Sequence, residues 1–237
     1  MRSTKLGGSA VAVVSLIMVA IQSSVVAGPL HDATKRGDSQ KVRELLVTVA
    51  DVNKDLDEYG ATALHWAAVK GQKQIAEMLL DKGAKVEAKN RDGDTPLHLA
   101  VAFRHKDMVE LLLAKGAAVD ERRREGTTPL YIAVDRNEKG IVEALLAAGA
   151  QMDAKNKDGV TPLYRAAGKN LLDMASLLLS KGADPNAVNK DGDTPLHVAA
   201  AYGNKQMVEL LLSKGGDPHA KSKGGTTPGD FAKQQGH

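Results

Sequence analysis

The chain has 237 residues, of which 32 are basic, 29 are acidic, 3% are aromatic and none is cysteine. With so few aromatic rings, the core has to be built from small and aliphatic side chains, which favours closely packed helices over a β-sandwich. The lack of cysteine excludes disulfides, cysteine nucleophiles and thiolate metal ligands.

The first 27 residues differ from the rest of the chain. A short basic start with Arg2 and Lys5 precedes an apolar stretch at Ala10–Ile21 and a polar "QSS". Twelve helical residues span about 18 Å, too short for the roughly 30 Å core of a bilayer. Val25 and Ala27 then supply the small residues of a cleavage site, so residues 1–27 are predicted to be a signal peptide. The alternative is an uncleaved anchor.

A signal peptide predicts an exported protein, either periplasmic or secreted, with no membrane contact unless the segment stays uncleaved. Its removal would leave 30 basic against 29 acidic residues. A nearly neutral chain with few aromatic residues gives no argument for nucleic acid as a partner.

The remainder of the chain repeats itself with a period of 33, which is the step from Gly60 to Gly93. Each unit opens with a glycine, followed two residues later by threonine, and most units carry a second glycine further on. The first glycines are Gly60, Gly93, Gly126, Gly159, Gly192 and Gly225, and the second are Gly83, Gly116, Gly149, Gly182 and Gly215. A fixed period of roughly 20–50 residues is typical of a stacked repeat protein.

One unit shows what each repeat is expected to form. Thr95 is placed to cap a helix, with Pro96 at the first helical position, where no N–H is needed. Leu97 begins an apolar face at i, i+3 and i+4, and a second helix with the same spacing follows around Val109. Gly116 ends that helix in a left-handed conformation. The pattern predicts helix–turn–helix units joined by hairpin loops.

Two units, "GDTPLHLAVAFRHKDMVELLLAKGAAVDE" and "GDTPLHVAAAYGNKQMVELLLSKGGDPHA", resemble the ankyrin repeat family. The resemblance extends from about Pro29 to the C-terminus and implies an all-α repeat solenoid, with stacked helix-turn-helix repeats and β-hairpin loops. We expect one domain at 28–237, with repeats at about 29–59, 60–92, 93–125, 126–158, 159–191 and 192–224 and a partial C-terminal cap at 225–237.

The stretch "DGDTPLH", at residues 92–98 and 191–197, could be a metal or catalytic cluster of carboxylates and histidine. In the middle repeats, however, this histidine is replaced by Tyr131 and Tyr164. A metal-binding role shared by all repeats would not tolerate tyrosine there so readily. We interpret the histidine as a buried hydrogen-bonding residue, and the resemblance implies that it joins neighbouring loops. Known phosphate-loop, G-x-S-x-G and H-E-x-x-H motifs are also absent. The sequence therefore predicts no enzyme, metal site or cofactor.

The resemblance implies that a protein partner docks on the concave side, which is formed by the hairpin tips and the exposed face of the first helices. The candidate residues in these slots are Arg91, Phe103, Arg122, Arg124, Arg136, Lys157, Arg165 and Tyr202.

Three features distinguish these candidates. The tip "ERRREG" carries three arginines, with Arg123 where other repeats have Asn or Asp; Arg165 holds a slot that is apolar elsewhere; and Phe103 and Tyr202 are expected to face solvent. A basic middle flanked by aromatic anchors indicates a partner with an acidic face. The alternative is a solvated run of charges.

The sequence therefore predicts an exported, monomeric scaffold that binds another protein. Two other functions stay open at this level. One is a secreted effector acting on host proteins, and the other is a metal-dependent enzyme using Asp and His residues at the turns.

Overall fold

The structure is a computed structural model that describes residues 28–237, so the predicted signal peptide at residues 1–27 lies outside the described part. The described residues form pairs of helices in chain order. The first helices are α2 (Pro29–Arg36), α4 (Ala63–Lys70), α6 (Pro96–Ala102), α8 (Pro129–Asp135), α10 (Pro162–Gly168), α12 (Pro195–Ala201) and α14 (Pro228–Gln235). The second helices are α3 (Ser39–Thr48), α5 (Lys73–Asp81), α7 (Lys106–Ala114), α9 (Lys139–Ala147), α11 (Leu172–Ser180) and α13 (Lys205–Ser213).

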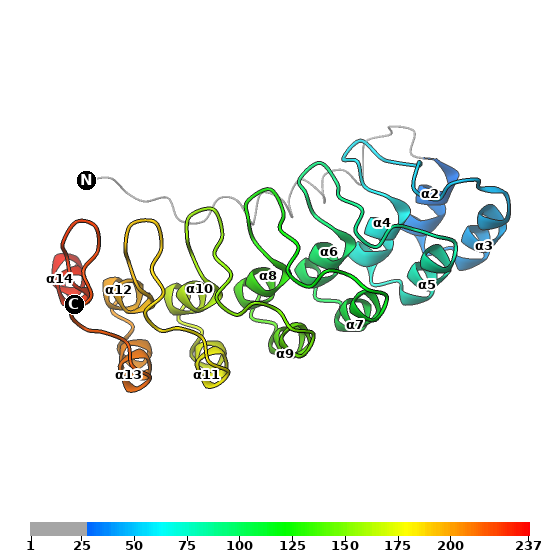
Figure 1. Cartoon of the computed structure of the whole chain (residues 1–237). Helices are drawn as coiled ribbons and strands as arrows, with labels where there is room; N and C mark the ends of the chain where they lie inside the picture. The colour runs from blue at the N-terminus through cyan, green and yellow to red at the C-terminus, as the bar shows by residue number, and fades with distance from the viewer. Residues whose placement is uncertain (1–27) are drawn as a thin grey trace.

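The helices stand in two layers along one row (Figure 1). Each first helix contacts the next first helix, and second helices contact one another in the pairs α3–α5, α5–α7, α7–α9 and α11–α13. The loops between pairs project from one side of the row. This arrangement confirms the predicted all-α solenoid. The loops have the shape of hairpins but no assigned strand in residues 28–237; for example, the N–H of Asn90 donates to the carbonyl of Asp94 at 3.0 Å.

Threonine caps the first helices, as predicted. In α6 the Oγ1 of Thr95 accepts the backbone N–H of His98, while the Nδ1 of His98 accepts the backbone N–H of Thr95 at 3.2 Å. This reciprocal pair satisfies two of the backbone donors that a helix start leaves unpaired. The same threonine cap begins six of the described helices, at Thr62, Thr95, Thr128, Thr161, Thr194 and Thr227.

The turn between the two helices of a pair needs a left-handed residue. Gly71 supplies it after α4 with φ +65°, and Gly203 supplies it after α12. The three repeats between them use Arg104, Asn137 and Asn170 instead, with φ between 54° and 66°. Arginine is the least suited of these residues to the left-handed region, because its Cβ crowds the backbone there.

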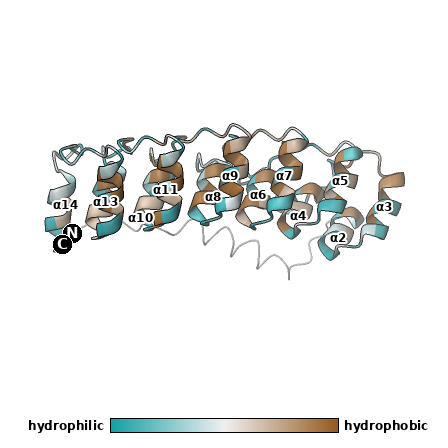
Figure 2. Cartoon of the chain, turned by 90° about the horizontal axis from the view of Figure 1, so that it is seen from below, coloured by the Kyte–Doolittle hydropathy of each residue, from teal (hydrophilic) through white to brown (hydrophobic). Residues whose placement is uncertain are grey.

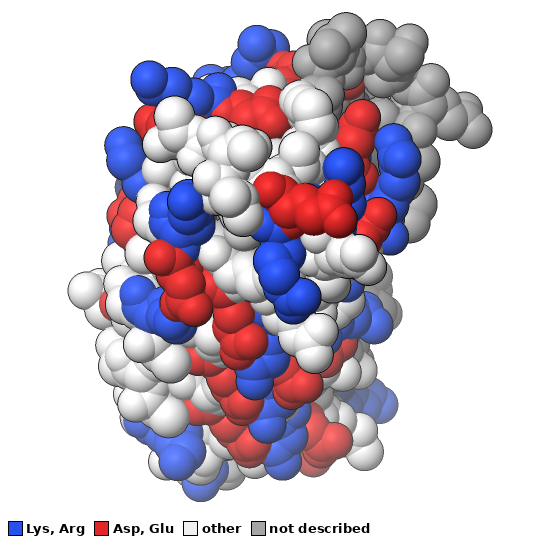
Figure 3. Space-filling view, turned by 90° about the vertical axis from the view of Figure 1, so that its right-hand side faces the viewer, with Lys and Arg blue, Asp and Glu red and all other residues white. Residues whose placement is uncertain are grey.

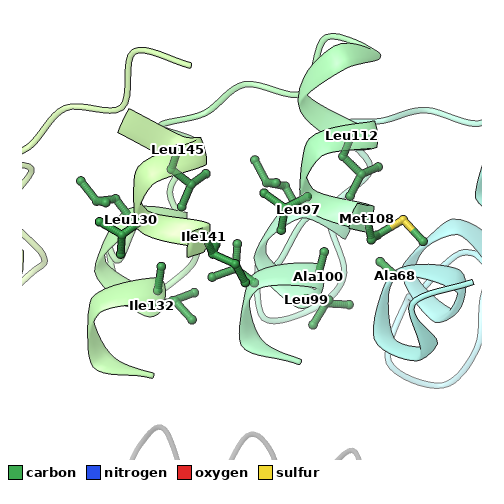
Figure 4. Packing of buried hydrophobic residues seen from close by; sticks show 14 of the residues in the cluster. Ala68, Leu97, Leu99, Ala100, Met108, Leu112, Leu130, Ile132, Ile141 and Leu145 are labelled. Atoms are coloured by element: carbon green, nitrogen blue, oxygen red, sulfur yellow. The ribbon is translucent and has the colours of Figure 1, made fainter. Parts of the chain in front are cut away.

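Leucines at equivalent positions of successive repeats form one continuous core. Figure 4 shows Leu97 and Leu112 of one pair lying beside Leu130 and Leu145 of the next. All four side chains are at most 1% exposed. Replacing one such leucine by alanine would cost about 2–5 kcal/mol. Hydrophobic residues are dense in α7 and α9, while α14 at the end of the row is more hydrophilic (Figure 2).

Candidate binding surface

The histidines of the repeated motif join consecutive repeats. The Nε2 of His65 lies 3.0 Å from the carbonyl oxygen of Asp94, and the Nε2 atoms of His31 and His197 make equivalent contacts one repeat on, at 2.7 and 3.1 Å. His98 is equally buried in the same slot, and the backbone of Thr127, one repeat on, is its equivalent neighbour, but its Nε2 makes no hydrogen bond of ordinary geometry within residues 28–237. All four histidines are therefore buried as inferred from the sequence, and three of them make the joining hydrogen bond with ordinary geometry.

These histidines are not arranged as metal ligands. Burial lowers the pKa of both His65 and His98 to about 4, so both rings are neutral at pH 7. In the described part of the chain, no three His, Asp or Glu side chains converge in a way that could hold a metal ion. "DGDTPLH" serves the architecture of the repeat.

The second carboxylate of the motif is buried rather than poised for chemistry. Asp94 is 1% exposed, and its backbone N–H donates to the side chain of Asn90. The guanidinium of Arg123, in the next repeat, approaches the Asp94 carboxylate to 3.7 Å. Burial raises the pKa of Asp94, and the Arg123 charge opposes that rise.

Hydrogen bonds join successive hairpin tips. The N–H of Arg124 donates to the carbonyl of Asp92 at 3.0 Å, and Lys157 donates to Glu125 at 3.2 Å. Gly93 makes the close approach feasible: its φ is +79°, and a Cβ there would lie 2.9 Å from the backbone nitrogen of Arg124. The tips therefore form a continuous row of regular spacing.

The tip row carries both signs of charge. Arg91, Arg124 and Lys157 occupy equivalent exposed positions, but an acidic residue directly follows each of them, namely Asp92, Glu125 and Asp158. Basic and acidic side chains are likewise interspersed on the face seen from the α2–α3 end of the row (Figure 3). The tips alone therefore do not make the middle of the surface basic.

Two arginines of the "ERRREG" tip are engaged inside the chain. The Nη1 of Arg122 donates to the carbonyl oxygens of Gly126 and Lys155, and the Nε of Arg123 donates to Thr127 Oγ1. Of the three, Arg124 has an exposed side chain with no hydrogen bond or ion pair to the described residues. Arg122 and Arg123 hold the loop, which leaves Arg124 for a partner.

A second row follows the C-terminal ends of the first helices, and we call it the helix-end row. Its members are separated by the repeat period and lie at the ends of α4, α6, α8, α10 and α12: Lys70, Phe103, Arg136, Lys169 and Tyr202. Tyr202 is 51% exposed, as expected. Phe103 is half-buried against the core, so the expectation of a solvent-facing ring was wrong in part. A ring that packs on the core is held rigidly and presents only its remaining area.

An ionic cluster lies between α8 and α10. The carboxylate of Asp135 receives Arg165 Nε at 2.5 Å and Lys169 Nζ at 3.1 Å. Burial raises the pKa of Asp135, but the two cations outweigh it and hold the pKa below its ordinary value. Arg136, beside the cluster, makes no side-chain hydrogen bond or ion pair with residues 28–237. With three cations and one carboxylate, the cluster keeps a positive excess.

The cluster is peculiar to these two repeats. The slot of Arg165 is held elsewhere by residues less than 10% exposed, namely Trp66, Leu99, Ile132 and Val198. The slot of Asp135 is held by Val69, Ala102, Gly168 and Ala201. Sequence comparison of the repeats singled out Arg165 but missed its pairing with Asp135, although both depart from an apolar or small slot.

The comparisons with known proteins agree with this geometry. A family profile, Ankyrin repeats (3 copies), matches residues 12–90, 84–156 and 138–222. The chain belongs to the ankyrin repeat family. Ankyrin repeat domains generally mediate protein–protein binding and are typically not enzymes.

Two solved structures cover most of the chain. The ankyrin repeat domain of Bcl-3, a member of the IkappaB protein family, has a TM-score of 0.79 and 32% identity over 86% of this chain and 93% of its own. The ankyrin repeat domain of human ASB11 has a TM-score of 0.76 and 30% identity over 86% and 91%.

Curated relatives match over a shorter stretch. Osteoclast-stimulating factor 1 of Xenopus laevis is 44% identical over 62 residues, and that of Sus scrofa is 46% identical over 61 residues. Each alignment spans 26% of this chain and 28% of the relative. Among residues 28–237, no helix combines the length and apolar character that crossing a bilayer requires.

Proposed function

We propose that this protein is an exported ankyrin-repeat scaffold that binds another protein through its concave surface. The observation that carries the proposal is the helix-end row, where the unpaired cation Arg136 and the half-exposed ring of Tyr202 sit on a rigid helical frame. Aromatic residues and arginine are the side chains most enriched at binding hot spots.

The size of the surface supports this function. Neighbouring helices pack about 8–10 Å apart, so five steps between repeats give a surface roughly 40–50 Å long. Such a length accommodates a standard interface of about 800 Å² per partner. The positive excess around Arg136, Arg165 and Lys169 favours a partner with an acidic face.

Crosslinking and affinity capture from the protein's own cells test this function. The bait is the full chain, compared with a double variant Arg136→Glu/Lys169→Gln. The matched control is Lys181→Glu/Lys115→Gln, which changes the same charges at the C-caps of second helices; Lys115, like Lys169, is paired with a carboxylate (Asp81). One dominant partner should be captured by the wild type and the control and lost by the variant. A partner retained by all three baits would refute this surface, and none captured by any bait would refute the scaffold.

Export rests on the composition of residues 1–27 and is tested separately. The mass of the chain recovered from the native cells should correspond to cleavage after Ala27, with the protein outside the cytoplasm. A full-length chain in the membrane fraction would indicate the uncleaved anchor. A full-length chain in the cytoplasm would contradict export.

A further inference from the structure

The helix-end row has an order of side chains that no single repeat contains. Its first member, Lys70, ends α4, and the other four, at the ends of α6, α8, α10 and α12, are Phe103, Arg136, Lys169 and Tyr202: an aromatic ring, two cations and a second aromatic ring. These four members offer a partner four contact points of two kinds. The two rings suit apolar side chains, and the two cations between them suit carboxylates.

The spacing of this row is fixed by the packing of the helices. Adjacent first helices contact each other directly, so neighbouring members of the row lie about 10 Å apart. An extended chain rises about 3.3 Å per residue, and a polyproline II chain about 3.1 Å, so three residues cover the same distance. In polyproline II every third residue also points to the same side.

We propose, on the basis of the protein-binding function above, that the helix-end row recognises an extended segment of a partner protein with one contact residue in every three. The segment carries an apolar residue, two acidic residues and a second apolar residue at this spacing. The acidic residues pair with Arg136 and Lys169, and the apolar residues cover Phe103 and Tyr202.

The charges of the row favour acidic residues at the two central contact positions of the partner segment. Arg136 has no partner inside the described chain, so it gains an ion pair without losing one. Both Lys169 and Arg165 form ion pairs with Asp135. When Lys169 moves to bind a ligand, Arg165 still neutralises the Asp135 carboxylate. A partner lysine at either position would meet like charge and be rejected.

An α-helix would span the row less economically. It rises only about 1.5 Å per residue, so it needs about seven residues for each step of about 10 Å between members of the row. Four contacts would then require about 22 residues of ordered helix, whereas an extended segment needs only about ten. The shorter segment orders fewer residues on binding and is the occupant that we infer.

Three synthetic peptides test the spacing against the purified protein by fluorescence anisotropy. The matched probe is Leu-Ser-Pro-Glu-Ser-Pro-Glu-Ser-Pro-Leu. An isomer, Leu-Glu-Glu-Ser-Pro-Ser-Pro-Ser-Pro-Leu, keeps composition, charge and end residues but loses the three-residue register. The third is a longer helical peptide that carries leucine and glutamate in the same order, with seven residues from each contact to the next.

The matched probe should bind at least tenfold more tightly than the isomer and more tightly than the helical peptide. Arg136→Glu/Lys169→Gln should abolish this preference, while Lys181→Glu/Lys115→Gln should leave it unchanged. Equal binding of the two short peptides, no binding of the matched probe up to millimolar concentration, or tighter binding of the helical peptide would overturn the inference. If the row variant still lost its captured partner in that case, the scaffold function would stand and only the three-residue register would fail.

Discussion

The imidazole of His65 joins two consecutive repeats, because its Nε2 lies 3.0 Å from the carbonyl oxygen of Asp94 while its Nδ1 accepts the N–H of Thr62. The contact requires a neutral ring, since a protonated Nδ1 could not accept that N–H. Burial provides for this by lowering the pKa of His65 to about 4.

The stability of the protein should fall in mild acid. Because the folded pKa of His65 and His98 is about 4 and the unfolded value is about 6.5, the unfolded chain binds more protons between these values. The free energy of unfolding is therefore fully present above pH 6.5 and decreases as the pH falls toward 4. Each histidine accounts for a loss on the order of 3 kcal/mol. Urea denaturation at pH 7 and pH 4.5 measures the change.

A single variant isolates one of these contributions. His98→Tyr places in this slot the residue type that other repeats carry there, at Tyr131 and Tyr164. The variant should lose the contribution of one buried imidazole, so its free energy of unfolding should depend less on pH than that of the wild type. The exposed His219→Gln serves as the control and should leave the profile unaltered. An identical pH dependence for His98→Tyr and the wild type would argue against the buried neutral ring.

Arg123 should stabilise the folded protein because its charge compensates the buried carboxylate of Asp94. Arg123→Ala removes the guanidinium that lies 3.7 Å from this carboxylate and leaves a 1% exposed carboxylate without a charged partner. We expect a loss of about 2 kcal/mol, measured by chemical denaturation at pH 7. Adding Asp94→Asn should restore most of it, because the uncompensated charge disappears. The neighbouring exposed Arg124→Ala should change stability by less than about 0.5 kcal/mol, and an equal loss in that variant would contradict this account.

The left-handed conformation of Arg104 should cost the protein some stability, and glycine at this position should avoid that cost. Arg104→Gly relieves a φ of +66° but loses the ion pair between Arg104 and Glu138, whereas Arg104→Ala loses the same ion pair and keeps the strain. The free energy of unfolding of the glycine variant should therefore exceed that of the alanine variant by about 1 kcal/mol. Thermal melts of the two variants give the comparison. Equal stabilities would mean that the surrounding turn relieves the strain by other means.

The ionic cluster of the candidate surface should contribute to partner binding without contributing to the stability of the fold. The double variant Asp135→Ala/Arg165→Leu restores the small and apolar residues that the other repeats carry in these slots. Its stability should equal or exceed that of the wild type, since a partly buried ion pair is often replaced by apolar residues at no cost. Capture of the partner should weaken, because Lys169 loses the carboxylate that holds its ammonium group and Arg165 no longer adds its charge. Undiminished capture by a stable double variant would remove the cluster from the binding surface.

The period of 33 predicted most of the fold because each repeated residue has a local task. Thr95 caps a helix, Gly93 lets two tips approach, and Leu97 fills the core, and all three roles follow from the residue type and its spacing. The fold class and the structural reading of the buried histidines were confirmed in this way, although the contact of His98 with the backbone of Thr127 falls short of ordinary hydrogen-bond geometry.

The surface was harder to predict, because partners of charged side chains come from neighbouring repeats. Arg122 and Arg165 read as free cations in the sequence, yet one is tied to the carbonyl of Lys155 and the other to Asp135. Those contacts are set by which residues lie one repeat away in space. Phe103 likewise sits at a surface position, and only the packing shows that its ring leans on the core.

The joined tips have a consequence for how a partner finds its place. A stack of near-identical units has translational symmetry, so a ligand that fits one unit could shift along by one unit and fit almost as well. The carbonyl-to-amide links between tips keep that step constant over the whole row. Asp135 and Arg165 break the symmetry at a single point, so a partner that uses them has one position of lowest energy and cannot slide.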